Sequence, residues 1–298
     1  MDALTLHAPA KINLCLSVLG RRPDGYHEVR MLMQAVGLFD QVTVRLAGEG
    51  VTVACNARGV PSGEDNIAAK AAREMIAHAG LRQGLAIDIV KNIPVAAGLG
   101  GGSSDAAAVL VACNRLLGLG WDRKRLADVG ARLGMDVPFF LYGPTALAAG
   151  RGEVLDPLPC PDAFWVLLVN PGFETSTAWA YQNLNLELTK KVDCNRIARL
   201  TVSKIAASLH NDLETVTASV HPVIGEMEQS LAAAGALGAR MSGSGPTVFG
   251  IFESGDACRA AAKKLETRGW LLYPAEVLTA PLYGEHLGPL HDQRDPDI

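Results

Sequence analysis

The sequence predicts an α+β protein with mixed sheets, and three observations lead to this class. Short segments of alternating apolar and polar side chains, typical of strands, are interspersed with segments of helical character. A strand, a glycine-rich loop and an apolar helix follow one another directly between residues 85 and 117. Three prolines fall within residues 156–161, and we interpret this segment as the passage between two domains, which a chain of 298 residues can accommodate.

In the N-terminal half, alternation predicts the strands, and capping residues predict where helices begin and end. Asn66 can cap a helix that Gly80 ends, and Gly134 ends another. Proline disfavours helix at the residue before it, so residues 135–138 are expected to form a loop. The expected elements are a strand over 10–20, a turn over 21–28, a second hairpin of strands over 39–46 and 51–55, a helix over 67–79, a strand over 85–90, and helices over 106–117 and 122–133.

The C-terminal half shows the same mixture of patterns. A second glycine loop, at residues 240–246, leads into an apolar strand, and Gly235 follows a helical segment. The expected elements are a buried strand over 164–169, helices over 176–183, 197–209 and 223–234, a strand over 247–252, a helix over 256–268, a strand over 271–279, and a polar, frayed tail from residue 283.

Composition narrows the class of protein and its compartment. A formal net charge of -4 gives no bulk attraction to nucleic acid or to an anionic membrane. Six cysteines are scattered without a C-x-x-C pair, which favours reduced thiols over a zinc or redox site. The N-terminus lacks the pattern of a signal peptide, and no apolar run reaches membrane-spanning length, so a cytoplasmic protein is expected, with the mature form of an organellar protein as the alternative.

The glycine-rich loop at residues 93–105 is the strongest chemical signal. Four glycines allow the backbone to approach an anion closely, and the loop leads directly into a helix, whose first N–H groups are unpaired and partly positive. This combination predicts a phosphate site. The P-loop and dinucleotide patterns both fail, because no lysine follows the glycines and Ser103 stands at the last glycine position. A flexible turn before a core helix is the alternative.

Two further residues cannot be assigned from their surroundings alone. Lys11 follows a proline at the start of a strand, where a surface lysine is the ordinary interpretation. Asp136 precedes Val137 and Pro138, where a loop carboxylate is the ordinary interpretation. Their spacing in the chain does not pair them.

Taken together, five motifs resemble the GHMP small-molecule kinases, in the order of that family and over most of the chain. They are PAKINL at 9–14, DGYHE at 24–28, GLGGGSSDAA at 98–107, GMDVPFF at 134–140 and SGSGPT at 242–247. Pro246 stands where the family often has a small polar residue. Residues 211–214 also match the family, but we can give them no physical role beyond a helix start.

The resemblance implies a two-domain GHMP kinase fold. Residues 1–158 would form an ATP domain like ribosomal protein S5 domain 2, and residues 159–298 a ferredoxin-like substrate domain. A strand near residues 277–282 would return to the first domain. The active site would lie between the two.

The resemblance also implies ATP and Mg²⁺ as cofactors and Lys11 and Asp136 as the catalytic pair. Phosphoryl transfer needs positioning and charge neutralisation, with Asp136 orienting the substrate hydroxyl and Lys11 lowering the surrounding charge. Ser104 is the hydroxyl expected near the metal. The residues expected to bind ATP are Pro94, Val95, Ala96, Ala97, Gly98, Leu99, Gly100, Gly101, Gly102, Ser103 and Ser104.

The segment around Tyr26 points to a member that acts on a cytidine diphospho-sugar alcohol. Tyr26 and His27 would stack on and hydrogen-bond the pyrimidine, Tyr181 would offer a second stacking face, and Asn13 would bind sugar-alcohol hydroxyls. The alternatives are a GHMP kinase for mevalonate, homoserine or a sugar, and an RNA-binding module on the S5-like fold, which the charge disfavours. No nucleic-acid or membrane partner is expected, and the enzyme would be a monomer or homodimer.

Overall fold

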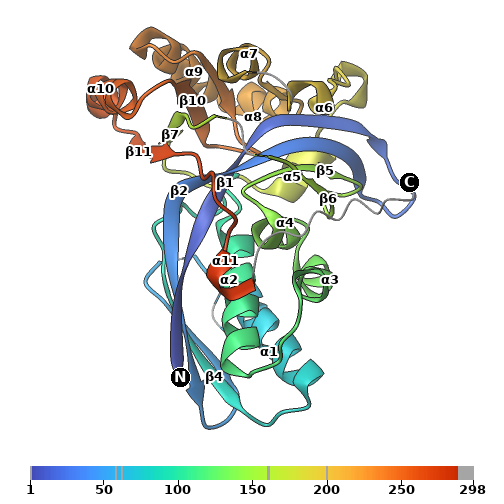
Figure 1. The fold of residues 1–298 in the computed structure, drawn as a ribbon. Coiled ribbons are helices and arrows are strands. Elements are labelled where there is room, and N and C mark those ends of the chain that lie inside the picture. The colour runs from blue at the N-terminus through green and yellow to red at the C-terminus, as the bar shows by residue number, and fades with distance from the viewer. Residues whose placement is uncertain (1, 58, 62, 160–161, 199–200, 288–298) are drawn as a thin grey trace.

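The computed structural model describes residues 2–57, 59–61, 63–159, 162–198 and 201–287. Figure 1 shows one group of elements built around the long strands β1 and β2 with helices α1–α4, and a second group that contains β7, β10 and β11 with helices α9 and α10. The α+β class is confirmed by two sheets, one of seven strands and one of four, of which only the seven-stranded sheet is mixed, with both parallel and antiparallel pairs.

The seven-stranded sheet has the order β3-β4-β2-β1-β8, with β5 and β6 attached to β2. Its longest members, β1 and β2, form an antiparallel hairpin whose β1 extends beyond both ends of the strand expected over 10–20. The strands are β1 (Ala3–Arg21), β2 (His27–Ala47), β3 (Val51–Cys55), β4 (Gly84–Val90), β5 (Thr145–Ala149), β6 (Val154–Pro157) and β8 (His210–Asn211).

The hairpin expected from residues 39–46 and 51–55 is wrong. Residues 39–46 are the end of β2, and β3 pairs in parallel with β4, which lies between them. Gly84 makes this insertion possible at the start of β4, since a Cβ there would lie 2.6 Å from the Glu49 carbonyl carbon. Alternation marks a strand but does not name its neighbour.

Helices α1 (Ile67–Ala79) and α2 (Gly101–Leu116) pack on this sheet, and α3 (Arg123–Leu133) and α4 (Val137–Tyr142) pack against α2 (Figure 1). The Asn66 side chain caps α1, accepting a hydrogen bond from the Ala68 N–H, and Gly80 ends it in a left-handed conformation. Every side chain of α2 from Ser104 to Asn114 is buried, which its many alanines allow because they let neighbouring elements approach closely.

Two boundaries in this region differ from the prediction for physical reasons. Helix α2 begins at Gly101 rather than Ala106, so the second half of the glycine loop is itself the first turn of the helix. Helix α4 begins at Val137, within the loop expected over 135–138. Pro138 is accommodated there because the first turn of a helix leaves its N–H groups unpaired in any case.

The four-stranded sheet is antiparallel with the order β11-β7-β10-β9. Its strands are β7 (Trp165–Asn170), β9 (Gly238–Met241), β10 (Val248–Phe252) and β11 (Leu271–Glu276). Helix α9 (Val223–Ala234) packs on β9 and β10, and α10 (Gly255–Leu265) packs on β7, β10 and β11. The succession of strand, helix, two strands, helix and strand is the ferredoxin-like arrangement.

The remaining helices are short and connect these layers. They are α5 (Thr177–Gln182), α6 (Cys194–Ile197), α7 (Val202–Ala207), α8 (Glu214–Val220), α11 (Gly284–Leu287), and 3-10 turns at Gly63–Asp65, Leu186–Leu188 and Glu266–Arg268. The single helix expected over 197–209 is wrong, because α6 ends at Ile197 and α7 begins at Val202. The tail expected to fray begins instead with α11 in contact with α2. Residues 160–161 of the proline-rich passage and 288–298 of the tail lie outside the described residues.

Cys15 and Cys194 form a disulfide, so the expectation of reduced thiols is wrong for this pair. The two residues are 179 positions apart, and only the packing of α6 on β1 brings them together. Spacing along the chain carries no signal for such a contact. Cys55, Cys113 and Cys258 are free.

Two buried clusters stabilise the fold. The larger lies between the first sheet and α1 and α2 and continues beneath α9 and α10. The smaller joins β1 and β2 to the other face of the second sheet, through residues such as Ile12, Val166 and Phe249. Val277, which follows β11, also contacts the first sheet, because it forms an isolated β-bridge with Val36 on β2.

Within the described residues, none of the helices combines the length and apolar character that crossing a membrane would require.

Candidate active site

A cavity of about 1070 Å³ opens where β1, the start of α2, the α3–α4 junction, α5 and the loop before β10 meet. Six residues expected in the site from the sequence line it together: Lys11, Asn13, Tyr26, His27, Asp136 and Tyr181. Its floor is the glycine loop, of which Ala96, Ala97, Gly98, Gly100, Gly101, Gly102 and Ser103 line the cavity.

Two glycines of this loop are required by their conformation and their neighbours. Gly98 and Gly100 have φ values of +78° and +71°, a left-handed backbone conformation that residues with a Cβ adopt only at a cost in free energy. A Cβ on Gly98 would lie 2.0 Å from the Ser242 carbonyl oxygen, and a Cβ on Gly100 would lie 3.0 Å from both the Lys11 and Phe140 side chains. The loop therefore lies directly against a second loop and against Lys11.

The other residues expected to bind ATP support the loop without lining the cavity: Pro94, Val95, Leu99 and Ser104. The Leu99 side chain is buried, and its carbonyl oxygen accepts a 2.9 Å hydrogen bond from the Lys11 N–H. Ser104, the hydroxyl expected near the metal, is fully buried and does not line the cavity, whereas the neighbouring Ser103 does. The helical turn that begins at Gly101 explains this, since it rotates successive side chains away from one another.

Lys11 and Asp136 meet in the cavity although they are distant in the chain. The Lys11 Nζ lies 3.6 Å from the Asp136 Oδ2 and donates a 2.7 Å hydrogen bond to the Asn13 Oδ1. The Lys11 side chain is 6% exposed and that of Asp136 is 28% exposed, so only the carboxylate reaches well into the cavity. Asp136 occupies the N-cap position of α4, where the turn after α3 places it.

Aromatic and basic side chains form part of the lining of the cavity. His27 and Tyr181 stack with ring centroids 5.2 Å apart, and Tyr26, 51% exposed, lies under the Arg151 guanidinium at 5.0 Å. Burial and the charge of Arg21 lower the pKa of His27, which favours its neutral form. Burial and the charge of Asp136 raise the pKa of Tyr181, so its hydroxyl stays protonated.

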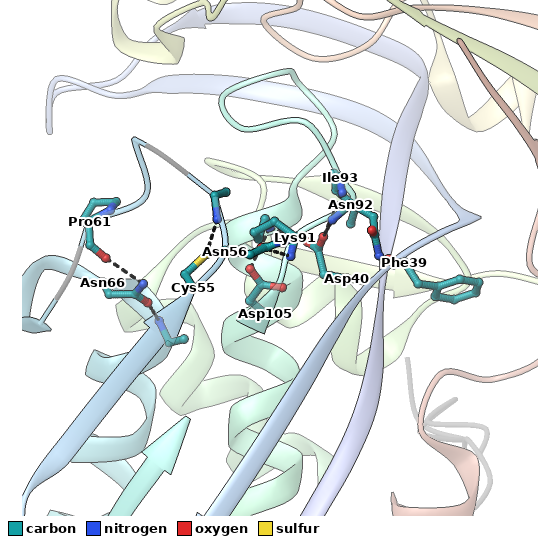
Figure 2. A network of polar contacts seen from close by, with 12 residues as sticks. Phe39, Asp40, Cys55, Asn56, Pro61, Asn66, Lys91, Asn92, Ile93 and Asp105 are labelled. Atoms are coloured by element: carbon teal, nitrogen blue, oxygen red, sulfur yellow. Dashed lines mark hydrogen bonds and ion pairs between the residues drawn. The ribbon is translucent and has the colours of Figure 1, made fainter. Parts of the chain in front are cut away.

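A buried polar network anchors the start of the glycine loop (Figure 2). Lys91 pairs with Asp40 and lies 2.8 Å from the Asp105 carboxylate on α2. Asp40 also accepts backbone hydrogen bonds from Asn92 and Ile93, at 2.6 and 2.8 Å. Burial and the neighbouring Asp40 raise the pKa of Asp105 above its ordinary value despite Lys91. The network joins β2 to both ends of the loop.

Sequence reasoning missed several residues that line the cavity. Gly243 and Ser244 belong to the second glycine loop, which the sequence marked without assigning it to the site. Arg21 and Arg151 also line the cavity. Arg151 stands between two glycines after a strand, a turn signal that could have drawn attention to it.

Comparisons with known proteins agree with this geometry. The family described as GHMP kinases N terminal domain matches residues 66–144, and GHMP kinases C terminal matches residues 195–269. A relative from Geobacter metallireducens named 4-diphosphocytidyl-2-C-methyl-D-erythritol kinase is 51% identical over 282 residues, covering 93% of this chain and 100% of the relative. One of the same name from Syntrophotalea carbinolica is 53% identical over 273 residues, covering 90% and 97%.

Solved structures lead to the same family. A crystal structure of 4-(cytidine 5'-diphospho)-2C-methyl-D-erythritol kinase superposes with a TM-score of 0.80 and 34% identity, covering 92% of this chain and 99% of that one. Homoserine kinase from Cytophaga hutchinsonii, at 22% identity and a TM-score of 0.70, shares the fold over 94% of this chain and 96% of its own. With this site and these relatives, the chain belongs to the 4-diphosphocytidyl-2-C-methyl-D-erythritol kinase family of the GHMP kinases.

Proposed function

We propose that this chain transfers the γ-phosphoryl group of ATP to the 2-hydroxyl of 4-diphosphocytidyl-2-C-methyl-D-erythritol, a step in non-mevalonate isoprenoid precursor biosynthesis. The observation that carries the proposal is a single cavity lined by the glycine loop, by the aromatic residues Tyr26, His27 and Tyr181, and by Lys11 and Asp136. Relatives about half identical to the chain over nearly its whole length carry the name of this kinase.

The glycine loop would hold the β- and γ-phosphates of ATP. The first N–H groups of α2 have no partner one turn earlier, and the glycines leave the backbone uncovered, so phosphate oxygens can accept hydrogen bonds there. Among the residues of the loop, Ser103 is the hydroxyl that reaches the same space. This arrangement supports binding through the backbone rather than through side-chain charge.

Lys11 and Asp136 would prepare the acceptor hydroxyl. A bond forms between the substrate oxygen and the γ-phosphorus, and the bond from that phosphorus to the bridging oxygen of ADP breaks. Asp136 would orient the hydroxyl and accept its proton as transfer proceeds, since an alcohol is too weak an acid to lose it beforehand. Lys11, held by Asn13 at 2.7 Å, would offset the negative charge that gathers around the transferred group.

The aromatic residues of the cavity would select the cytidine. Tyr26 and Tyr181 would offer stacking faces for the pyrimidine, and the neutral His27 would offer its ring nitrogens to the polar edge. Asn13, beside Lys11, would bind the hydroxyls of the methylerythritol.

Magnesium fits the site as a companion of ATP rather than as a resident ion. No group of three or more His, Cys, Asp or Glu able to hold a metal occurs among the described residues. Mg²⁺ commonly binds through one or two protein ligands and substrate phosphates, and Ser103 and Asp136 are the residues that would lie beside it. When bound, it would neutralise phosphate charge.

The proposal is tested by incubating the purified protein with ATP, Mg²⁺ and the cytidine diphospho-sugar alcohol and measuring the products by mass spectrometry. We expect one added phosphoryl group on the sugar alcohol and an equal amount of ADP. Mevalonate and homoserine are offered in parallel, because kinases of the same fold act on other alcohols. Preferential phosphorylation of either would overturn the substrate assignment while keeping the kinase.

A further inference from the structure

Residues 211–214 match the family motif but do not touch the reacting groups that we propose. In the structure they lie at β8 and the start of α8, behind the second glycine loop. Asn211 and Glu214 form hydrogen bonds with the backbone of that loop, residues 241–244, which lies against the phosphate loop.

Asn211 makes the central contacts. Its Nδ2 donates to the carbonyl oxygens of Met241 and Gly243, each at 2.8 Å, and its Oδ1 accepts from the Leu213 N–H at 3.0 Å. It is 4% exposed, so these bonds are shielded from water. Asparagine suits the position because one amide nitrogen supplies both donors, which an aspartate or a leucine cannot do.

Two further side chains hold the same backbone. Glu214 accepts a 2.8 Å hydrogen bond from the Met241 N–H and pairs with Arg240. The Thr217 hydroxyl, fully buried, donates to the Ser244 carbonyl oxygen at 3.1 Å. Three side chains from β8 and α8 therefore bond a segment of four residues.

That segment touches the proposed catalytic centre directly. The Ser242 hydroxyl donates to the Gly98 carbonyl oxygen at 3.0 Å and accepts from the Asn13 N–H at 3.3 Å. A Cβ added to Gly243 would lie 3.0 Å from the Gly98 oxygen and 3.4 Å from the Lys11 Nζ. A displacement of residues 241–244 would be passed to the phosphate loop and to Lys11.

The same motif is tied to the strand that carries Lys11 and Asn13. β8 pairs in parallel with β1 at Cys15 and Leu16, and the Asp212 carboxylate accepts a 2.7 Å hydrogen bond from the Val18 N–H. The motif therefore contacts both β1 and the second glycine loop, and fixes their relative position.

We infer that Asn211, Glu214 and Thr217 are positioning residues that fix the second glycine loop against the phosphate loop and Lys11. The kinetic part of this inference rests on the proposed kinase function. A misplacement of about 1 Å among reacting groups can cost on the order of a hundredfold in rate, so the effect is expected in kcat.

The test compares Asn211→Asp with Asn114→Asp. Asn114 is also buried and bonds backbone, donating to the Trp121 carbonyl oxygen and accepting from its N–H, both at 2.9 Å, near the far end of α2. Both changes place an oxygen against a carbonyl oxygen. We expect both to lower the thermal midpoint, but only Asn211→Asp to lower kcat per folded molecule, by about ten- to a hundredfold. Equal kcat values for the two variants would overturn the inference.

Two measurements keep the test decisive. Thr217→Val removes one hydrogen bond with little change of shape and is expected to lower kcat by about two- to tenfold. If Asn211→Asp does not fold, the decision falls to this variant, and an unchanged kcat in Thr217→Val overturns the inference. Amide hydrogen exchange of Lys11 and Asn13, whose N–H groups donate to the Leu99 carbonyl oxygen and to the Ser242 hydroxyl, should accelerate in Asn211→Asp and not in Asn114→Asp, whether or not the wild type phosphorylates the substrate. Unchanged exchange would refute the positioning role separately from the proposed function.

Discussion

Replacing Gly98 by alanine tests the contact between the two glycine loops. The new Cβ would lie 2.0 Å from the Ser242 carbonyl oxygen and 3.0 Å from the Gly245 nitrogen, both backbone atoms, at a φ of +78°. The left-handed conformation costs about 1–2 kcal/mol for a residue with a Cβ. Relieving the clash costs a further 1–3 kcal/mol or so. The sum, about 2–5 kcal/mol, is a large part of the 5–15 kcal/mol typical of a folded domain.

Gly269→Ala is the matched control. Its φ is +75°, and a Cβ there would have nothing within 4 Å. It therefore carries the conformational cost alone, and the two variants should differ in unfolding free energy by about 1–3 kcal/mol in urea titrations.

Kinetics complete the comparison of the two glycine variants. Gly98→Ala should lower kcat at least about tenfold, because the phosphate loop must move away from Ser242, whereas Gly269→Ala should leave kcat unchanged. Equal losses of stability together with normal kcat in both variants would refute the reasoning that the two loops depend on close contact.

Three other predictions follow from the site and the second sheet. Asp136→Asn should lower the single-turnover rate by about 10²–10⁴-fold while ATP still binds; Lys11→Ala should cost a comparable factor, and losses that simply multiply in the double variant would contradict a coupled pair. Tyr26→Ala should weaken calorimetric binding of a cytidine nucleotide by roughly 1–3 kcal/mol with ATP affinity kept, and an equal loss for ATP would show a general effect on the cavity. Burial and the neighbouring Glu214 raise the pKa of Glu228 from 4.5 to about 8. Between pH 4.5 and 8 the folded state therefore keeps a proton that the unfolded state releases, so the free energy of unfolding falls as pH rises through this range. Glu228→Gln should remove that fall. The same change of thermal midpoint with pH in wild type and variant across this range would contradict the prediction.

Much of the fold could be predicted because local patterns and local structure coincide. The Asn66 cap and Gly80 lie at the two ends of α1 as the sequence indicated, since capping depends on neighbouring residues alone. The start of α2 was misjudged because glycines and serines are poor helix formers, yet they are favoured where a backbone must be left open.

The features that local sequence patterns could not predict depend on contacts between segments that are distant in the chain. The partner of β3 is β4 rather than β2, and no alternation of side chains can reveal which strand inserts between two others. The meeting of Lys11 with Asp136 has the same origin, and the family resemblance rather than the spacing suggested it. The sequence predicts both Ser103 and Ser104 in the ATP site and Ser104 near the metal, but which of two adjacent serines lines the cavity depends on the rotation of α2, and only Ser103 does so.

The smaller buried cluster has a consequence for how the molecule can come apart. Strand β7 is covered on both sides: Val166 and Leu168 belong to the cluster shared with β1 and β2, and Leu167 and Val169 belong to the other. A fragment beginning at residue 159 would lack β1 and β2, so the face of β7 that carries Val166 and Leu168 would lie in water, where it would associate with other chains. The parts of the chain before and after residue 159 are therefore expected to unfold together, in one cooperative transition. The cavity, which residues from both parts line, would be lost as soon as either part unfolds.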